Sequence, residues 1–262
     1  MLDPNQDAQA SALLWQHWEG GTRLDEIPAA FRPSTRAEGY AIQALLESRS
    51  AAPRFGWKIA ATSVAGQKHI NVDGPLAGRL LKEKVLEVGA EISLATSNMC
   101  VAEVEFAFRF GRDLTPRLAE YKVEEVLAAV TTLHPAIEIP DSRFNDFCKV
   151  GAAQLIADNA CANLFILGEA TTADWRTVDL ATYEVDAEIV GKSAHRGIGS
   201  NVLGDPRVAL TWIVNELSAL GITMRAGEVV TTGTCLVPIA VQPGDEVRAD
   251  FGRFGKVSAK FC

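Results

Sequence analysis

The spacing of apolar residues predicts helices in the first part of the chain and mainly strands later. The clearest helix is predicted over 36–48, where apolar residues recur at helical spacing behind a capping box formed by Thr35 and Glu38. Asp205 followed by Pro206 marks the start of another helix. The predicted helices are 8–18, 36–48, 122–130, 150–157 and 205–220.

From about residue 84 onward, short apolar runs separated by turn signals predict strands. The expected strands are 101–110, 134–139, 162–167, 184–190, 228–232, 235–241, 246–250 and 256–261. Strands and helices do not alternate regularly, which disfavours a doubly wound parallel sheet. We therefore predict an α+β fold with a helical N-terminal portion over 1–83 and a β-rich portion over 84–262, or a single domain that combines the two.

Composition narrows the class of protein. The 262 residues include 33 Asp and Glu against 25 Lys and Arg, a net charge of −8. This acidity argues against nucleic-acid binding, which needs clustered basic side chains. No apolar run approaches the ~20 residues of a membrane-spanning helix, and the N-terminus lacks the pattern of a secretory signal. The five cysteines are scattered without a CxxC spacing and fit reduced thiols, so we expect a cytoplasmic protein that binds neither nucleic acid nor membrane.

One predicted strand, 101–110, carries two acidic residues opposite a wholly apolar face. Because side chains alternate between the faces of a strand, Glu103 and Glu105 lie side by side on one face. Adjacent carboxylates repel each other unless a positive group lies between them, and a hard divalent cation such as Mg²⁺ or Mn²⁺ fits there. The alternative is a solvated face with Arg109 as the counter-charge, and the spacing alone favours this alternative.

A third carboxylate shifts the balance between a solvated face and a metal site toward the metal site. Glu138 lies between Ile137 and Ile139 in another short apolar strand, where a buried and unpaired carboxylate is costly. Three carboxylates from two neighbouring strands would form an oxygen-rich site that leaves room for water and substrate. The sequence does not show that the strands are neighbours, and a solvent-facing Glu138 is the alternative.

Two further polar residues lie in mainly apolar surroundings. Lys58 is either a surface lysine with a buried stem or a residue that binds an acidic substrate or supports metal-binding carboxylates. Asp158 either ends an apolar helix or contributes a polar group to a pocket. The glycine-rich segment 191–204 lacks the dinucleotide-binding pattern and fits a hairpin followed by a loop that approaches a ligand.

Together, several short motifs resemble the 2-keto-4-pentenoate hydratase family, which belongs to the fumarylacetoacetate hydrolase superfamily. The resemblance covers about residues 36–262 and depends on the order and spacing of the motifs rather than on any one of them. The motifs are Gly56-x-Lys58, Glu103-x-Glu105, Ala136-x-Glu138-x-x-x-Ser142-Arg143, Ala157-Asp158-Asn159-Ala160, Gly199-Ser200-x-x-Leu203-Gly204-x-Pro206 and Thr232-Gly233.

The resemblance implies a β-rich roll of the fumarylacetoacetase C-terminal-domain type, preceded by helices and assembled into a homo-oligomer. It implies Mg²⁺ or Mn²⁺ as the cofactor, held by Glu103, Glu105 and Glu138. Lys58 is then a catalytic residue beside the metal and substrate, and Asp158 is the candidate base for the attacking water. The substrate-binding positions are Arg143, Ser200, Thr232 and Gly233.

The activity implied by the resemblance is that of a hydro-lyase in the catabolism of aromatic compounds. The enzyme would add water to a 2-hydroxy-2,4-dienoate and give a 4-hydroxy-2-oxo acid. A 2-oxo acid can chelate one cation through its carboxylate and keto oxygens, which favours ketonisation of the dienol and makes the fourth carbon electrophilic. A small 2-hydroxydienoate or 2-oxo acid is therefore the expected substrate.

Three alternatives remain open at this point. The same chemistry would serve a 4-oxalocrotonate-type decarboxylase or an acylpyruvate C–C hydrolase. The family often has a basic residue and a proline where this chain has Met99-Cys100, and a serine where it has Cys161. These departures motivate a third hypothesis, an accessory subunit that stabilises a partner enzyme of the same pathway, although retention of all three glutamates argues against it.

Overall fold

The computed structural model describes residues 2–262, and every helix predicted from the sequence is present in it. The helix predicted over 36–48 is α-helical to Ala44 and continues as a 3₁₀ turn to Ser48. Among the described residues, no helix is both long enough and apolar enough to cross a membrane. The α-helices are α1 (Pro4–Gly20), α2 (Arg36–Ala44), α3 (Val64–His69), α4 (Val123–Leu127), α5 (Gly151–Ala157) and α6 (Pro206–Ala219).

Side-chain caps explain where the longest helices begin. Asp3 accepts hydrogen bonds from the first backbone N–H groups of α1. Thr35 and Glu38 form the predicted capping box at the start of α2. At α6, Asp205 is the cap and Pro206 occupies the first helical position, as the sequence pattern predicted.

The strands of residues 2–262 form two sheets. The larger has the order β2-β1-β10-β5-β6-β7-β3, with β11 paired to β5, and the smaller has the order β4-β13-β12-β8-β9. The strands of the larger sheet are β1 (Gly56–Ala60), β2 (Leu76–Leu80), β3 (Val85–Leu86), β5 (Val101–Phe110), β6 (Val130–Ile139), β7 (Leu164–Leu167), β10 (Val229–Thr234) and β11 (Ile239–Ala240). Those of the smaller sheet are β4 (Glu91–Ile92), β8 (Glu184–Ile189), β9 (Ser193–Ile198), β12 (Glu246–Asp250) and β13 (Lys256–Phe261).

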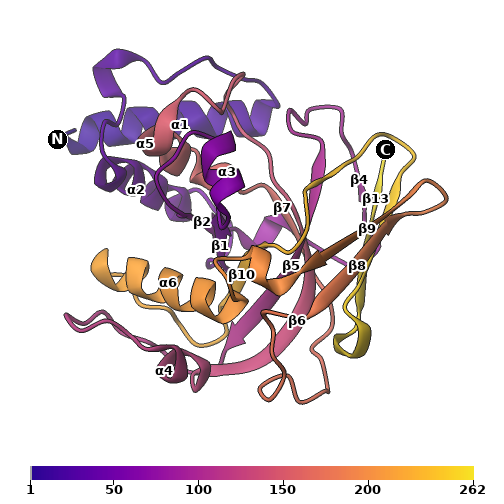
Figure 1. The fold of residues 1–262 in the computed structure, drawn as a ribbon. Helices are drawn as coiled ribbons and strands as arrows, with labels where there is room; N and C mark the ends of the chain where they lie inside the picture. The colour runs from indigo at the N-terminus through magenta and orange to yellow at the C-terminus, as the bar shows by residue number, and fades with distance from the viewer. Residues whose placement is uncertain (1) are drawn as a thin grey trace.

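The main core joins the two sheets and α6. The apolar face of β5 contributes Val104, Phe106 and Phe108, which are all fully buried. The ring of Phe106 meets that of Phe251, just after β12, edge to face at 5.1 Å between centroids. Figure 1 shows α1, α2 and α5 together at the end of the molecule opposite the smaller sheet. A second cluster packs these helices and consists of Ala10, Leu14, Ile27, Ile42, Phe144 and Ala157.

Two strands that were not predicted, β1 and β2, lie within the N-terminal portion 1–83. Both are almost entirely buried and extend the larger sheet, with β1 lying between β2 and β10. Each carries a buried cationic residue, Lys58 or Arg79, which interrupts the apolar pattern that would have indicated a strand. The division at residues 83 and 84 stays a prediction, and the larger sheet extends across it.

The strand predicted over 235–241 is largely wrong, because only Ile239–Ala240 is extended and paired. Pro238 has no N–H to offer a neighbouring strand. The carbonyl of Cys235 accepts hydrogen bonds from the backbone of Ile198 and from the side chain of Asn201, instead of a regular strand partner. The segment therefore leaves its pairing with β5 between Cys235 and Ile239, and through Cys235 it is hydrogen-bonded to the β8–β9 hairpin.

Candidate metal centre

The three glutamates singled out in the sequence meet on one face of the larger sheet. The antiparallel register places Glu103 on β5 directly opposite Glu138 on β6, with Glu105 two residues further along β5 on the same face. One carboxylate oxygen from each of the three lies within 4.8 Å of the others. The two strands are thus neighbours, which the sequence alone left open.

Burial and mutual repulsion make negative charge costly at this site. Glu105 and Glu138 are fully buried, whereas Glu103 is partly exposed. Burial, followed by the charges of Glu138 and Glu103, raises the pKa of Glu105 well above its usual value. Burial also raises the pKa of Glu103, and it raises that of Glu138 to about 7 despite the opposing charge of Lys58. The cluster therefore needs protons or a cation to offset its charge.

Unpartnered oxygen atoms show that the cluster fits a cation. Oε1 of Glu105 and Oε2 of Glu138 are buried, and neither has a hydrogen-bond donor among residues 2–262. A buried carboxylate oxygen without a donor is strongly unfavourable, so native structures supply such atoms with a partner. The donor set is three carboxylates, the oxygen ligands that hard divalent cations prefer. Glu103, Glu105 and Glu138 are therefore suited to hold a divalent cation.

Lys58 on β1 supplies positive charge to this cluster. Its side chain is 2% exposed, and its Nζ lies 3.0 Å from Oε1 of Glu138 in an ion pair. Nζ also donates a hydrogen bond of 3.1 Å to the carbonyl oxygen of Ala160. Burial alone would lower the pKa of Lys58, but the charges of Glu138 and Glu103 raise it above its usual value. The hypothesis of an exposed lysine is wrong: Lys58 is a buried cation beside the glutamates.

Strand β10 holds one oxygen of Glu105. The hydroxyl of Thr231 and the backbone N–H of Gly233, the latter at 2.8 Å, both donate to Oε2 of Glu105. Gly233 is among the substrate positions predicted from the sequence, whereas Thr231 is not. A threonine in a buried strand is ordinary, and only its position next to the Thr232-Gly233 motif could have drawn attention to it.

Arg143 and Asp158 lie together, with their polar atoms engaged inside the protein. Asp158 accepts hydrogen bonds from Nε and the backbone N–H of Arg143 and from the hydroxyl of Ser142. The remaining guanidinium nitrogens of Arg143 donate to the carbonyl oxygens of Asp141, Asp158 and Ala162. Both side chains are almost completely buried. This pair joins the end of β6 to the turn that follows α5, and it makes no contact of this kind with the three glutamates.

The remaining predicted substrate positions differ in their surroundings. Thr232 is buried, and its hydroxyl donates to the carbonyl of Phe106, on the strand that carries Glu105. Ser200 is exposed on the 3₁₀ turn after β9. Its loop reaches the centre through Leu203, whose N–H donates to the carbonyl of Thr62. Thr62 in turn packs so closely on Gly233 that a Cβ at Gly233 would lie 2.0 Å from its Oγ1.

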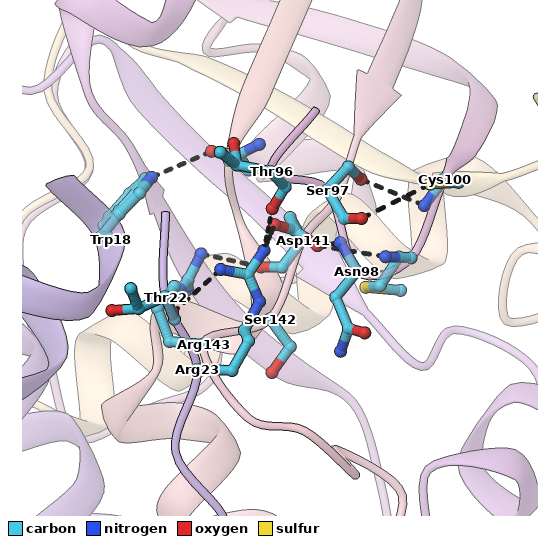
Figure 2. Close-up of polar contacts among 12 residues, drawn as sticks. Trp18, Thr22, Arg23, Thr96, Ser97, Asn98, Cys100, Asp141, Ser142 and Arg143 are labelled. Atoms are coloured by element: carbon cyan, nitrogen blue, oxygen red, sulfur yellow. Dashed lines mark hydrogen bonds and ion pairs between the residues drawn. The ribbon is translucent and has the colours of Figure 1, made fainter. Parts of the chain in front are cut away.

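A polar network braces the ends of the two strands that carry the glutamates. Figure 2 shows Asp141, just after β6, between Arg23 and the segment that precedes β5. Oδ1 of Asp141 accepts from the backbone N–H groups of Asn98 and Met99 at 2.8 and 3.1 Å. Arg23 donates both to Oδ2 of Asp141 and to the carbonyl of Thr96. These contacts reinforce the register that places Glu103 opposite Glu138.

Comparison with known protein families agrees with this arrangement. The model of the fumarylacetoacetate (FAA) hydrolase C-terminal family matches residues 52–262, which include every residue of the centre. The chain belongs to the fumarylacetoacetate hydrolase family. The resemblance stated from the sequence motifs is thereby confirmed, and so is the α+β roll that it implied.

Within this family, the chain is similar to hydratases. It is 31% identical to a 2-keto-4-pentenoate hydratase of Paraburkholderia xenovorans over 99% of this chain and 96% of the relative. It is 35% identical to a 2-hydroxyhexa-2,4-dienoate hydratase of Comamonas testosteroni over 79% of this chain and 78% of the relative. The chain is thus a fumarylacetoacetate hydrolase family member of the 2-keto-4-pentenoate hydratase group.

Solved structures of this family include one that matches over the whole chain. The 4-oxalocrotonate decarboxylase of Pseudomonas putida G7, complexed with magnesium and adipate, has a TM-score of 0.89 and is 25% identical, covering 100% of this chain and 99% of that one. The same enzyme complexed with calcium and acetate has a TM-score of 0.87. This one enzyme of the same overall fold has thus been solved with either of two divalent cations.

Proposed function

We propose that this protein is a divalent-cation-dependent hydratase that adds water to the fourth carbon of a 2-hydroxy-2,4-dienoate, giving a 4-hydroxy-2-oxo acid. The observation that carries the proposal is the cluster of Glu103, Glu105 and Glu138, whose oxygens lie within 4.8 Å of one another. Such a cluster, with buried oxygens that lack donors, is suited to one cation that a 2-oxo acid can chelate. The hydratases among the relatives support this substrate class.

Mg²⁺ or Mn²⁺ is the proposed cofactor, because all three candidate ligands are carboxylates. When bound, the cation supplies Lewis-acid polarisation of the substrate carbonyl. Glu105 and Glu138 would hold it from the buried side and Glu103 from the more exposed side. The magnesium complex of the structurally similar decarboxylase supports this assignment.

Lys58 is the proposed electrostatic catalyst. Its ammonium group has three protons, and the protein accepts two of them at Glu138 and at the carbonyl of Ala160. The third proton is available to the substrate carboxylate or to the negative charge that develops during ketonisation. The charges of Glu138 and Glu103 raise the pKa of Lys58 and so favour its positively charged form.

For Asp158 and Arg143, the contacts support a positioning role over the roles of base and substrate ligand suggested by the sequence. Both oxygens of Asp158 already accept hydrogen bonds from Arg143 or Ser142. A general base needs an oxygen within reach of the attacking water. We propose that this pair holds the turn after α5, whose Ala160 carbonyl orients Lys58.

The substrate would lie between the glutamates and the edge formed by Thr62, Gly233 and the loop of Ser200. Gly233 contributes through its backbone, since its φ of 106° and its contact with Thr62 leave no room for a side chain. The hydroxyl of Thr232 already donates to the carbonyl of Phe106. Thr232 would therefore contribute through its position in β10 and not through its hydroxyl. Ser200 is exposed and free to face the solvent side of a bound substrate.

Decarboxylation of a 4-oxalocrotonate-type acid is the second candidate, favoured by the TM-score of 0.89 with such an enzyme. The hydratase is preferred because identity with hydratases reaches 31–35%, against 25% with the decarboxylase. The two reactions are separable by their products. Released carbon dioxide from 4-oxalocrotonate, without turnover of a 2-hydroxydienoate, would favour the decarboxylase.

The test is loss of the conjugated absorbance of 2-hydroxypenta-2,4-dienoate in the presence of the full chain and Mg²⁺. We expect turnover that stops on addition of a chelator and returns with excess Mg²⁺. Glu138→Gln should lose activity by at least a hundredfold, since it removes a ligand charge. Glu188→Gln, the same change at an exposed position on β8, should leave activity unchanged. Equal activity of the wild type and Glu138→Gln would contradict the proposal.

The homo-oligomer stays a prediction from the resemblance, the cytoplasmic location a prediction from the composition, and a partner enzyme of the same pathway a prediction from the departures at Cys100 and Cys161. Light scattering of the purified chain measures the first of these directly, and a monomeric mass would contradict it. An accessory role predicts a chain that turns over no dienoate alone but increases the activity or stability of the partner enzyme.

A further inference from the structure

A β-bulge in β10 faces the candidate metal centre. The register between β10 and β5 is regular up to Thr231 opposite Ala107 and shifts before Thr234 opposite Glu105. Gly233 lies within this irregularity with a φ of 106°, a conformation that side chains disfavour. The bulge directs the Gly233 N–H away from the regular ladder and onto Oε2 of Glu105, at 2.8 Å.

The Thr231 hydroxyl donates to the same oxygen. Thr231 pairs with Lys58 on one side and with Ala107 on the other, so its side chain lies on the face that carries Glu105. Oε2 of Glu105 therefore has two donors. Oε1 of the same carboxylate is buried and has none among residues 2–262. The two oxygens of Glu105 are thus distinct before any ligand binds.

We propose that Thr231 is a positioning residue of the metal centre. Together with the Gly233 amide it holds Oε2 of Glu105 and leaves Oε1 as the one oxygen offered to the cation. This inference rests on the metal centre of the proposed function. Partners that fix the orientation of a metal ligand commonly contribute 10–100-fold in metal affinity. Mg²⁺ requires near-ideal octahedral geometry, so it depends on such orientation more than Ca²⁺ does.

The adjacent threonine provides a matched control. Thr232 is also fully buried, but its hydroxyl donates at 2.9 Å to the carbonyl of Phe106, not to a glutamate. Thr231→Val and Thr232→Val each replace a buried hydroxyl by a methyl group of similar shape. Both should therefore lower thermal stability, whereas only Thr231→Val removes a contact with a candidate ligand.

Calorimetric titration of the full metal-free chain with Mg²⁺ tests the proposal. We expect Thr231→Val to weaken Mg²⁺ binding about tenfold or more. Thr231→Ser, which keeps the hydroxyl, should restore affinity to near the wild-type value, and Thr232→Val should bind as the wild type does. Equal affinity of the wild type and Thr231→Val, or an equal loss in Thr231→Val and Thr232→Val, would overturn the proposal.

A titration with Ca²⁺ adds a readout that a purely structural role would not change. Ca²⁺ accepts six to eight oxygens and often binds both oxygens of a carboxylate. Loss of one of the two donors to Oε2 in Thr231→Val should therefore lower the preference for Mg²⁺ over Ca²⁺, and an unchanged preference would argue against the single-oxygen arrangement. Absence of Mg²⁺ binding by the wild type contradicts the metal-dependent function itself, whereas binding that is equal in Thr231→Val contradicts this inference alone.

Discussion

Glu105 lies in surroundings that suit a ligand at the expense of stability. Its Oε2 is held by two donors, its Oε1 has none among residues 2–262, and two other carboxylates face it. Burial and the charges of Glu138 and Glu103 raise its pKa well above the usual value. A residue in these surroundings costs folding free energy unless a cation or proton is present.

Glu105→Gln should therefore have opposite effects with and without metal. In chelator, we expect the variant to melt at a higher temperature than the wild type, because it removes a buried negative charge and its amide can donate to a neighbouring carboxylate. With excess Mg²⁺, the wild type should gain stability by preferential binding to the folded state, and the variant should not. Calorimetric melting in the two buffers measures both effects.

Glu188→Gln, on the exposed face of β8, is the control and should respond to Mg²⁺ as the wild type does. A full Mg²⁺-dependent increase of the melting temperature in Glu105→Gln would contradict the assignment of Glu105 as a ligand.

Among single residues, the sequence predicted those that carry the negative charge of the centre better than those that orient them. The alternation in 101–110 identified Glu103 and Glu105, because an apolar face determines which residues share the other face. Thr231 was missed because its contact with Glu105 depends on the pairing of β10 with β5, which no local pattern indicates. Arg143 and Asp158 were recognised as polar residues of interest, but only the fold shows that they pair with each other.

Among the elements, β2 shows how a side chain can close the edge of a sheet. It lies at one edge of the larger sheet, and Asn159 covers part of it. The Arg79 N–H donates to Oδ1 of Asn159 at 2.7 Å, and Nδ2 of Asn159 donates to the Arg79 carbonyl at 2.9 Å. Asn159 starts three consecutive residues with positive φ, which end at Cys161, and asparagine tolerates that conformation better than most residues. The same turn presents the Ala160 carbonyl to Lys58.

Asn159→Ala should lower the free energy of unfolding by about 2 kcal/mol or more, because it leaves two buried backbone groups of Arg79 without partners. It should also lower activity, since the turn that orients Lys58 loses its anchor. Urea unfolding and the dienoate assay measure the two effects. Asn145→Ala removes one exposed hydrogen bond to Asp25 and should change neither by a comparable amount. Equal stability of the two variants would contradict the role of Asn159.

The N-terminus of α2 provides a pH-dependent contribution at a distance from the centre. Glu38 accepts from the backbone and hydroxyl of Ser34 and from the backbone N–H groups of Leu2 and Thr35. These hydrogen bonds, led by the backbone of Ser34, lower the pKa of Glu38 to about 2. The ionised form is thus favoured in the folded state. Its contribution is complete above the ordinary pKa of 4.5 and disappears as the pH falls toward 2.

Glu38→Gln should accordingly reduce the melting temperature by several degrees at pH 7. The difference from the wild type should shrink as the pH falls from 4.5 toward 2, where wild-type Glu38 becomes protonated. Melting temperatures measured across this range test the prediction. A difference that stays constant or grows on acidification would contradict it.

At the level of elements, helix starts were predictable because capping is local, as at Thr35 and Asp205. Strands β1 and β2 were not, since their buried Lys58 and Arg79 obtain partners only from distant segments. The segment 235–241 was expected to be one strand because its composition is apolar, yet Pro238 and the contacts of Cys235 interrupt it.

In the whole molecule, the helical and β-rich portions share one sheet. β1 pairs in parallel with β10 and in antiparallel with β2, so the N-terminal portion supplies both the edge of the larger sheet and Lys58. This sharing could not be foreseen from composition, because pairing between distant segments leaves no local pattern. The candidate centre draws on both portions, with Lys58 from the N-terminal one and the three glutamates from the β-rich one.

A chain that begins at residue 84 should consequently fail to fold as an independent unit. It lacks β1 and β2. Loss of β1 would expose the edge of β10 that pairs with β1 in the full chain. We expect circular dichroism to show no cooperative thermal transition for this fragment, in contrast to the full chain. A cooperative transition with a native-like content of strand would instead support two separate domains.

Glu103, Glu105, Glu138 and Lys58 together form the proposed metal-dependent site for hydration of a dienoate. The most direct measurement is the NMR spectrum of the product formed from 2-hydroxypenta-2,4-dienoate by the purified chain with Mg²⁺. We expect a 2-oxo acid with a hydroxyl group on its fourth carbon, formed only when the metal is present. A product without that hydroxyl group, or no conversion at all, would contradict it.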